Sequence, residues 1–191
     1  VNGDLTAPPT VTAGPPVSIS AVEVPANGNV ILVYEARVTQ YASPNVEGAV
    51  TNTVTLTGDG VLTPITAQET ISAAERAALT INKSISPTVV SENGTLTYTF
   101  VIQNSGNVAA TTEDTIIVTD TFDPRLKNIT VTYNGTAWTE GVNYTYNEAT
   151  GLFTTATGQI AVPAAAYSQD AQTGAWTLTP GTAVITVKGT V

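Results

Sequence analysis

The sequence predicts an all-β protein made of Greek-key, Ig-like β-sandwich repeats. Thr and Val are abundant and long helix-forming stretches are nearly absent, a composition that favours strands. Many short runs alternate apolar and polar side chains, as half-buried strands do. Turn-forming residues separate these runs at the short intervals typical of a sandwich. The clearest turns are Asn27-Gly28, Asn93-Gly94, Ser105-Gly106-Asn107 and Asn134-Gly135.

The alternating runs give the expected strands in chain order. They cover residues 17–24, 29–39, 48–57, 61–71, 79–86, 94–103, 114–121, 128–133, 143–146, 159–162, 175–178 and 183–191. The beginning of the chain contains Pro8-Pro9 and Pro15-Pro16, which predict an edge segment or an extended linker because proline lacks a backbone donor.

Two stretches of the chain resemble each other and suggest an internal duplication. Residues 28–38 parallel residues 181–191, a spacing of 181 − 28 = 153 residues, and each follows a nearby proline. We therefore expect a chain cut out of register with its repeat. Residues 1–71 would form the C-terminal part of one sandwich repeat, and residues 79–191 a second repeat that lacks its last strand. Residues 72–78 would link them through one short helical turn, since Ser72-Ala73-Ala74-Glu75 has the capping-box pattern.

The composition excludes several classes of protein. With 42% hydrophobic and 11% charged residues, the 191-residue chain can form a core. Its net charge of −9 and six scattered basic residues argue against a nucleic-acid partner. The absence of Cys and His excludes thiol catalysis, disulfides, imidazole bases and the usual zinc sites. The longest apolar run, residues 30–34, is too short to span a bilayer, so we expect no membrane insertion in this segment.

Three polar residues interrupt the apolar faces of predicted strands: Lys83, Asp120 and Asn52. Burying an amine, a carboxyl and an amide is costly unless they satisfy one another. They are also the three groups from which a side-chain isopeptide bond is made. Their apolar neighbours on the same strand faces are Leu79, Ile81 and Ile85 for Lys83; Ile116, Val118 and Phe122 for Asp120; and Val50, Val54 and Leu56 for Asn52.

The chemistry expected of these residues is a single self-modification. In an apolar core the neutral, nucleophilic amine of Lys83 is favoured, and a protonated Asp120 would polarise the amide carbonyl of the asparagine. Ammonia leaves, and an amide joins two strands. The alternative is structural: Lys83 extends its amine toward solvent at a strand end, or forms an ion pair with Asp120.

The chain also contains an ordered set of motifs. They are Lys83-Ser84-Ile85-Ser86-Pro87, Gly94, Leu96-Thr97-Tyr98-Thr99-Phe100, Asn104-Ser105-Gly106-Asn107, Val118-Thr119-Asp120-Thr121 and Pro124-Arg125-Leu126. Before them, Pro25 to Val38 is followed by Thr51-Asn52-Thr53-Val54-Thr55-Leu56. In this order the motifs resemble the bacterial surface repeats known as DUF11 domains and the related D2 domains of Gram-positive fimbrial subunits.

This resemblance implies a function and a location. It implies a structural stalk or spacer module of a secreted bacterial cell-surface, cell-wall or fimbrial adhesin-type protein, stabilised by a Lys–Asn isopeptide bond with Asp120 as its promoter. Neighbouring repeats are the expected partners. The family's own Thr-Asn-Thr strand does not follow Asp120 here, so Asn52 serves only if residues 48–57 fold back or a neighbouring molecule donates them by strand exchange.

Other functions remain as alternatives. A host-protein or glycan-binding adhesin module would use Trp138, Trp176, Tyr144 and Tyr146, although aromatics on hairpins usually pack against neighbouring strands. Glu113, Asp114, Asp120 and Asp123 do not have a recognised calcium-loop spacing, so no metal or other cofactor is expected. Without a His base or a Gly-x-Ser-x-Gly elbow, we do not expect an enzyme.

Overall fold

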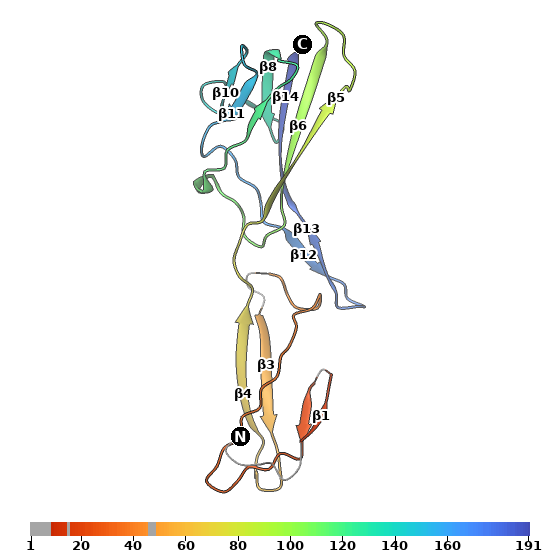
Figure 1. Cartoon of the computed structure of the whole chain (residues 1–191), viewed down its shortest axis with the longest axis vertical. Helices are drawn as coiled ribbons and strands as arrows, with labels where there is room; N and C mark the ends of the chain where they lie inside the picture. Colours follow the sequence, from red (N-terminus) through yellow and green to blue (C-terminus); the bar gives the residue numbers. More distant parts are fainter. Residues whose placement is uncertain (1–8, 15, 46–48) are drawn as a thin grey trace. The chain divides into compact units, whose positions relative to one another are not determined.

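The structure is a computed structural model of the chain, and it describes residues 9–14, 16–45 and 49–191. The chain divides into two compact units, with the boundary between Val38 and Thr39. Strands in several antiparallel sheets make up nearly all of the regular structure, which confirms the predicted all-β, sandwich-type fold class (Figure 1).

The first unit contains one small antiparallel pair, β1 (Thr10–Thr12) with β2 (Ser18–Ser20). The strand predicted over residues 29–39 is wrong, because the structure has no strand there. This stretch has the apolar composition of a strand, but Val33 and other large side chains in it are exposed. Composition alone does not make a strand, since the backbone also needs a partner to accept its hydrogen bonds.

In the second unit, a hairpin comes first. Strand β3 (Ala49–Leu56) pairs antiparallel with β4 (Ile65–Ser72) in a separate two-stranded sheet, where Asn52 lies opposite Glu69. One face of this hairpin is polar: the Thr51 and Thr70 hydroxyls are 3.1 Å apart, and the Gln68 amide donates to the Thr53 hydroxyl at 3.0 Å. The other face carries its aliphatic residues.

A β-sandwich follows the hairpin. Its larger sheet has the strand order β5-β6-β14-β8-β9, and its smaller sheet the order β10-β11-β7. The larger sheet comprises β5 (Leu79–Ser86), β6 (Thr95–Asn104), β8 (Lys127–Tyr133), β9 (Thr136–Trp138) and β14 (Gly181–Thr190). The smaller one comprises β7 (Thr119–Thr121), β10 (Tyr144–Asn147) and β11 (Leu152–Thr155). A further hairpin joins β12 (Ala166–Gln169) to β13 (Trp176–Thr179), and Thr112–Asp114 form a 3-10 turn.

The core fills the space between these two sheets. Alternate residues of the central strands point inward, as period-2 patterning requires: Leu96, Tyr98, Phe100 and Ile102 from β6, and Ala183, Ile185 and Val187 from β14. The smaller sheet contributes Tyr144 and Phe153, and the rings of Phe100 and Phe153 stack across the gap with centroids 6.5 Å apart.

Several predicted elements differ from the observed ones. The structure has no strand over residues 114–118 or over most of 159–162, where we expected strands. Conversely, β1, β9, β11 and β12 were not predicted as strands. The predicted helical turn at 72–78 is also wrong: Ser72 ends β4, and residues 73–78 have no helix. Their backbone donors bond elsewhere, because Arg76 N–H donates to Asn107 Oδ1 at 3.0 Å and Ala78 N–H to Asn104 Oδ1 at 2.9 Å.

Asn104 fixes the place where the 73–78 segment meets the sandwich. Its side chain is fully buried, and both Oδ1 and Nδ2 of this side chain form two hydrogen bonds each. Oδ1 accepts from the backbone of Ala78 and Gly106, and Nδ2 donates to the carbonyls of Val108 at 2.8 Å and Pro163 at 3.0 Å. Gly106 is needed for the same close approach, since a Cβ there would lie 2.2 Å from the Arg76 carbonyl oxygen.

We expect Asn104→Ala to lower the free energy of unfolding by at least about 2–3 kcal/mol, because it leaves buried backbone groups without partners. Asn82→Ala is the matched control, since Asn82 is exposed and reaches Gln103 only at 3.5 Å; its effect should stay within about 0.5 kcal/mol. Urea unfolding followed by circular dichroism measures both. Equal midpoints for the two variants would contradict the role given to Asn104.

Candidate functional site

Lys83 is placed by the register of the larger sheet. It lies on β5 opposite Phe100 of β6, so its side chain points to the same face as that core ring. Because β5 is the last strand of this sheet, the side chain is covered from one side only and remains 40% exposed. The predicted inward direction is therefore observed, while the full burial that we expected is not.

Asp120 approaches Lys83 from the smaller sheet. It lies on β7 opposite Phe153, and its Oδ2 is 2.5 Å from Lys83 Nζ. The side chain is 19% exposed, but Oδ2 itself is buried and has no hydrogen bond of acceptable geometry within the described part of the chain. The contact between the two side chains is therefore described as a close ion pair.

Three aromatic rings lie beneath the lysine. Lys83 Nζ is 4.8 Å from the ring centroid of Tyr98, 5.7 Å from that of Phe122 and 5.8 Å from that of Phe100. Tyr98 and Phe122 stack with centroids 4.6 Å apart. Their faces attract a cation and exclude water from the inner side of the pair.

The Tyr98 hydroxyl belongs to the same environment. It donates to the carbonyl of Asp123 at 3.3 Å. Burial raises the pKa of Tyr98 above its ordinary value of 10.0, and the negative charge of Asp120 raises this pKa further. Asp123 and Tyr146 act in the same direction. Burial and the neighbouring acidic groups therefore disfavour an additional negative charge at this site.

The structure does not place all three predicted residues together. Asn52 lies on β3, in the two-stranded sheet with β4, whereas Lys83 and Asp120 meet at the edge of the sandwich. Sequence patterning predicted the strand face on which each residue lies, and this prediction depends only on neighbouring residues in the same strand. Which strands become neighbours is decided by topology, which patterning does not contain.

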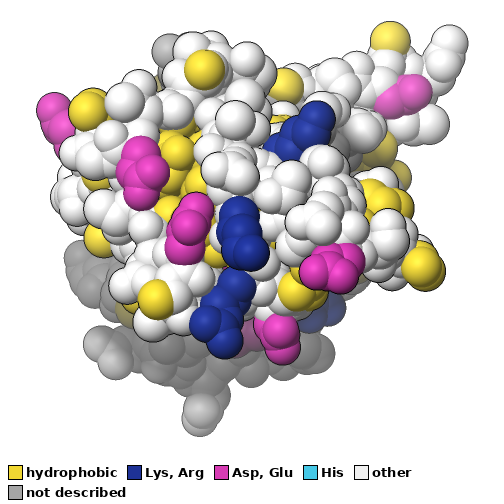
Figure 2. All heavy atoms as spheres, turned by 90° about the horizontal axis from the view of Figure 1, so that it is seen from above, with side chains coloured by type: hydrophobic (Ala, Val, Ile, Leu, Met, Phe, Trp, Pro, Cys, Tyr) yellow, Lys and Arg dark blue, Asp and Glu magenta, His cyan; other side chains and the backbone are white. Residues whose placement is uncertain are grey.

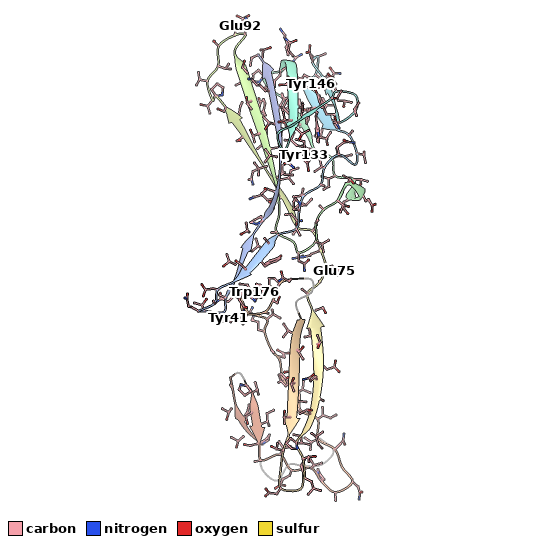
Figure 3. All side chains as sticks on the ribbon, turned by 180° about the vertical axis from the view of Figure 1, so that it is seen from behind. Tyr41, Glu75, Glu92, Tyr133, Tyr146 and Trp176 are labelled. Atoms are coloured by element: carbon pink, nitrogen blue, oxygen red, sulfur yellow. The ribbon has the colours of Figure 1, made fainter. Side chains whose placement is uncertain are left out.

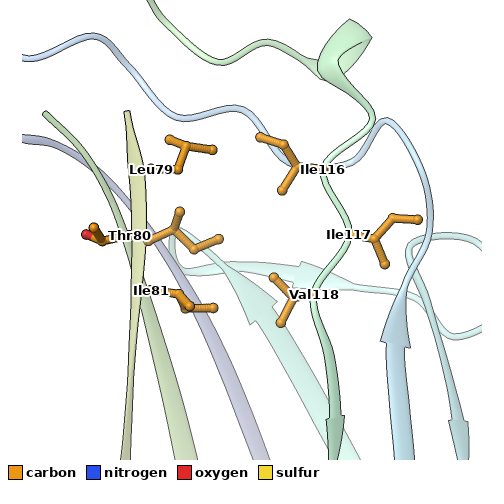
Figure 4. Close-up of a pocket in the computed structure, with 7 residues that line it drawn as sticks. Leu79, Thr80, Ile81, Ile116, Ile117 and Val118 are labelled. Atoms are coloured by element: carbon orange, nitrogen blue, oxygen red, sulfur yellow. The ribbon is translucent and has the colours of Figure 1, made fainter. Parts of the chain in front are cut away.

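An apolar pocket next to the ion pair was not predicted from the sequence. It lies between β5 and the segment leading into β7, and Leu79, Ile81, Ile116 and Val118 line it together with Thr80, Ile102 and Ile117 (Figure 4). Its volume is roughly 180 Å³. The sequence feature that corresponds to this pocket is the apolar run Ile116-Ile117-Val118 before Asp120. The alternation pattern places that run in a longer strand, residues 114–121.

The aromatic residues considered for glycan binding do not gather on one face. Tyr144 is in the core, and Trp138 stacks on Tyr133 with centroids 5.0 Å apart. The Tyr146 hydroxyl bonds both backbone groups of Leu126. Trp176 lies in β13 (Figure 3), where its backbone N–H donates to the Gln40 carbonyl at 3.1 Å. Trp138, Tyr144 and Tyr146 are therefore engaged in packing.

Two of the acidic residues considered for calcium, Asp114 and Asp120, have partners within the chain. Asp114 accepts from the backbone N–H of Thr111 at 2.6 Å and caps the 3-10 turn. In the described ranges, no group of three or more acidic side chains is arranged to hold a metal ion. Basic and acidic side chains lie beside one another on the face seen in Figure 2. Within the same residues, no helix has the length and apolarity that a membrane span requires.

Comparisons of the chain with models of protein families, with curated proteins and with solved structures give no match. The site is therefore interpreted from its own geometry.

We expect the raised pKa of Tyr98 to make stability fall at alkaline pH. Protonated Tyr98 stabilises the fold fully below about pH 10, and this contribution is lost as the pH rises through the raised pKa of the folded state. Urea unfolding between about pH 9 and pH 11 should show a smaller decline for Tyr98→Phe than for the unmodified chain. Tyr41→Phe, at an exposed position, should keep the original decline. An identical decline in all three proteins would contradict this account.

Proposed function

We propose that this protein is a structural stalk or spacer module of a bacterial cell-surface or fimbrial adhesin-type protein, stabilised by an isopeptide bond between Lys83 and an asparagine. The observation that carries the proposal is the Lys83–Asp120 pair, with Nζ 2.5 Å from Oδ2 above three aromatic rings. The amine and the carboxyl that the proposed reaction would use are in contact with each other.

The proposed reaction needs no cofactor. The Lys83 amine attacks the side-chain carbonyl carbon of the asparagine, and a C–Nζ bond forms. In the ion pair the Lys83 nitrogen is an ammonium, so Asp120 first takes one proton from it and leaves the neutral amine that attacks. The protonated carboxyl polarises the asparagine carbonyl and delivers its proton to the departing amide nitrogen, and Asp120 takes the second Nζ proton as the new amide forms. The C–N bond of the original amide breaks and ammonia leaves, so atoms and charge balance without an oxidant. Holding amine and carboxyl in position is the main contribution of the fold.

The surroundings of the pair support this chemistry. The rings of Tyr98, Phe100 and Phe122 cover its inner side and reduce the access of water, which strengthens interactions between polar groups. The outer side is open, because β5 and β7 each end a sheet. An asparagine on an added strand would reach Lys83 from that side.

A cross-link at this position would suit a module that carries tension. Joining β5 covalently to another strand restricts the unfolded chain as a disulfide does, by about 2–4 kcal/mol for typical loops. The chain has no cysteine, so disulfides cannot supply this restriction. An amide also resists reduction. A single bond-forming event of this kind is self-modification without turnover.

We expect denaturing intact-mass spectrometry to find a species lighter by one ammonia for each bond formed, within one chain or in a covalent oligomer. Lys83→Ala and Asp120→Ala should each abolish this loss, because the first removes the nucleophile and the second the proton carrier. Lys127→Ala is the matched control at an exposed lysine of β8 and should retain the loss. The full calculated mass in the unmodified chain, or a loss that persists in Lys83→Ala, would overturn the proposal.

A further inference from the structure

The pocket beside the ion pair has the properties of a groove for a β-strand. Small-molecule sites usually measure about 300–1,000 Å³, and this pocket holds roughly 180 Å³ with an almost wholly aliphatic lining. It has room for aliphatic side chains and no convergent polar groups to orient a ligand. Leu79 and Ile81 point across it toward Ile116 and Val118 (Figure 4).

Both walls of the groove end in an unpaired strand edge. Strand β5 pairs only with β6, and β7 only with β11, among the strands that the structure describes. The inward-facing side chains of β5 are poorly covered as a result; Ile81, for example, is 52% exposed. An exposed strand edge beside an uncovered apolar face is the template for addition of another strand.

The β3–β4 hairpin has the complementary defect. Its aliphatic face is uncovered, with exposed fractions from 41% at Val50 to 67% at Ile71. Two-stranded ribbons of this kind are marginally stable until another layer or strand covers them. Strand β3 pairs with β4 along one edge, and no other described strand pairs with its second edge. The hairpin can therefore add to a sheet without being dismantled.

The two strands match residue by residue. Strands β3 and β5 each have eight residues. Placed antiparallel with their ends aligned, Asn52 lies opposite Lys83. In the same register the apolar residues of the two strands coincide: Val50 with Ile85, Val54 with Ile81, and Leu56 with Leu79. A parallel alignment that keeps Asn52 opposite Lys83 leaves Leu79 without an apolar partner.

We propose that the groove at β5 binds strand β3 of a second copy of this chain. The chain's own β3 cannot occupy it in this register, because β4 and β5 would then run parallel with β3 between them. From Ser72 to Leu79 the connection would have to cover about 25 Å, a strand length along the sheet and two strand spacings across it, whereas seven Cα–Cα steps reach at most about 23–25 Å even when straight and fully extended. Arg76 and Ala78 are also held by Asn107 and Asn104.

This contact joins two different surfaces, so each molecule offers one donor strand and one groove. Such head-to-tail contacts produce open chains or closed rings. The net charge of −9 on each copy opposes association, and added salt should therefore strengthen it. Docking depends only on strand pairing and apolar burial. The covalent step, in which Asn52 of the donor supplies the amide, rests on the proposed function.

The test is the molar mass of the full chain by light scattering over a range of concentrations. We expect multiples of the monomer mass for the unmodified chain. Ile81→Asp should destroy the groove and Val54→Asp the donor, and each variant alone should be monomeric. Mixed, they should give a dimer and nothing larger, because one intact groove then meets one intact donor strand. The matched control for Ile81→Asp is Asn82→Asp, and that for Val54→Asp is Thr53→Asp. Each control places the same charge on the other face of the same strand, and both should still assemble.

The outcomes separate docking from chemistry. A monomeric unmodified chain at all concentrations, or single variants that still assemble, would overturn the docking proposal. Assembly without loss of ammonia would leave docking in place and reject the isopeptide bond. Loss of ammonia confined to the monomer mass would support the bond and reject donation by a second copy. Lys83→Ala should assemble but dissociate in denaturant.

Discussion

The contact between Lys83 and Asp120 joins the two sheets of the sandwich at the side where both end. Across the centre of the larger sheet, strand pairing is continuous from β6 through β14 to β8, and the core that these strands cover is buried. At β5 and β7 the cover is incomplete, and the charged pair occupies the boundary between aromatic core and solvent. Because Lys83 remains partly exposed, its ion pair alone adds little stability. The chemistry proposed for the pair would give this geometry a use that stability alone does not.

The rest of the sandwich keeps this pair in place. Phe100 and Phe153 lie directly opposite Lys83 and Asp120 in their respective sheets, and the two rings stack on each other. The separation of the charged side chains is therefore set by the packing of the rings below them. Close-packed cores transmit small changes in volume, so the spacing of the pair depends on residues that never touch the amine. Asn104 acts at the other end of β5 by fixing where that strand begins.

Sequence patterning predicted the long strands well and only some of the short ones: the four-residue strands β10 and β13 were predicted within one residue at each end, whereas others were missed. The bounds of β5, β6 and β14 were predicted closely because eight or ten alternating residues give a clear period. Strands of three or four residues, such as β9 and β11, carry too few residues to show one. Residues 29–39 had a suitable composition but found no partner strand. The capping-box pattern at 72–78 did not produce a helical turn, because the backbone N–H groups of Arg76 and Ala78 donate to the side chains of Asn107 and Asn104 instead.

The candidate site shows the same division between local and non-local information. The face on which Lys83 lies follows from alternation alone, and so does that of Asp120. Their meeting depends on β5 and β7 both ending their sheets on the same side, a property of topology. The open groove was invisible in the sequence for the same reason, since Ile81 has the pattern of a core residue. A side chain that the sequence pattern predicts to be buried but that is half-exposed, such as Ile81, indicates that a neighbouring strand is missing. The aliphatic side chains of β3 are exposed in the same way. In a stalk, joining such surfaces between molecules would place each proposed cross-link at a junction between copies, where a pulling force would act on the covalent bond as well as on the strand pairing.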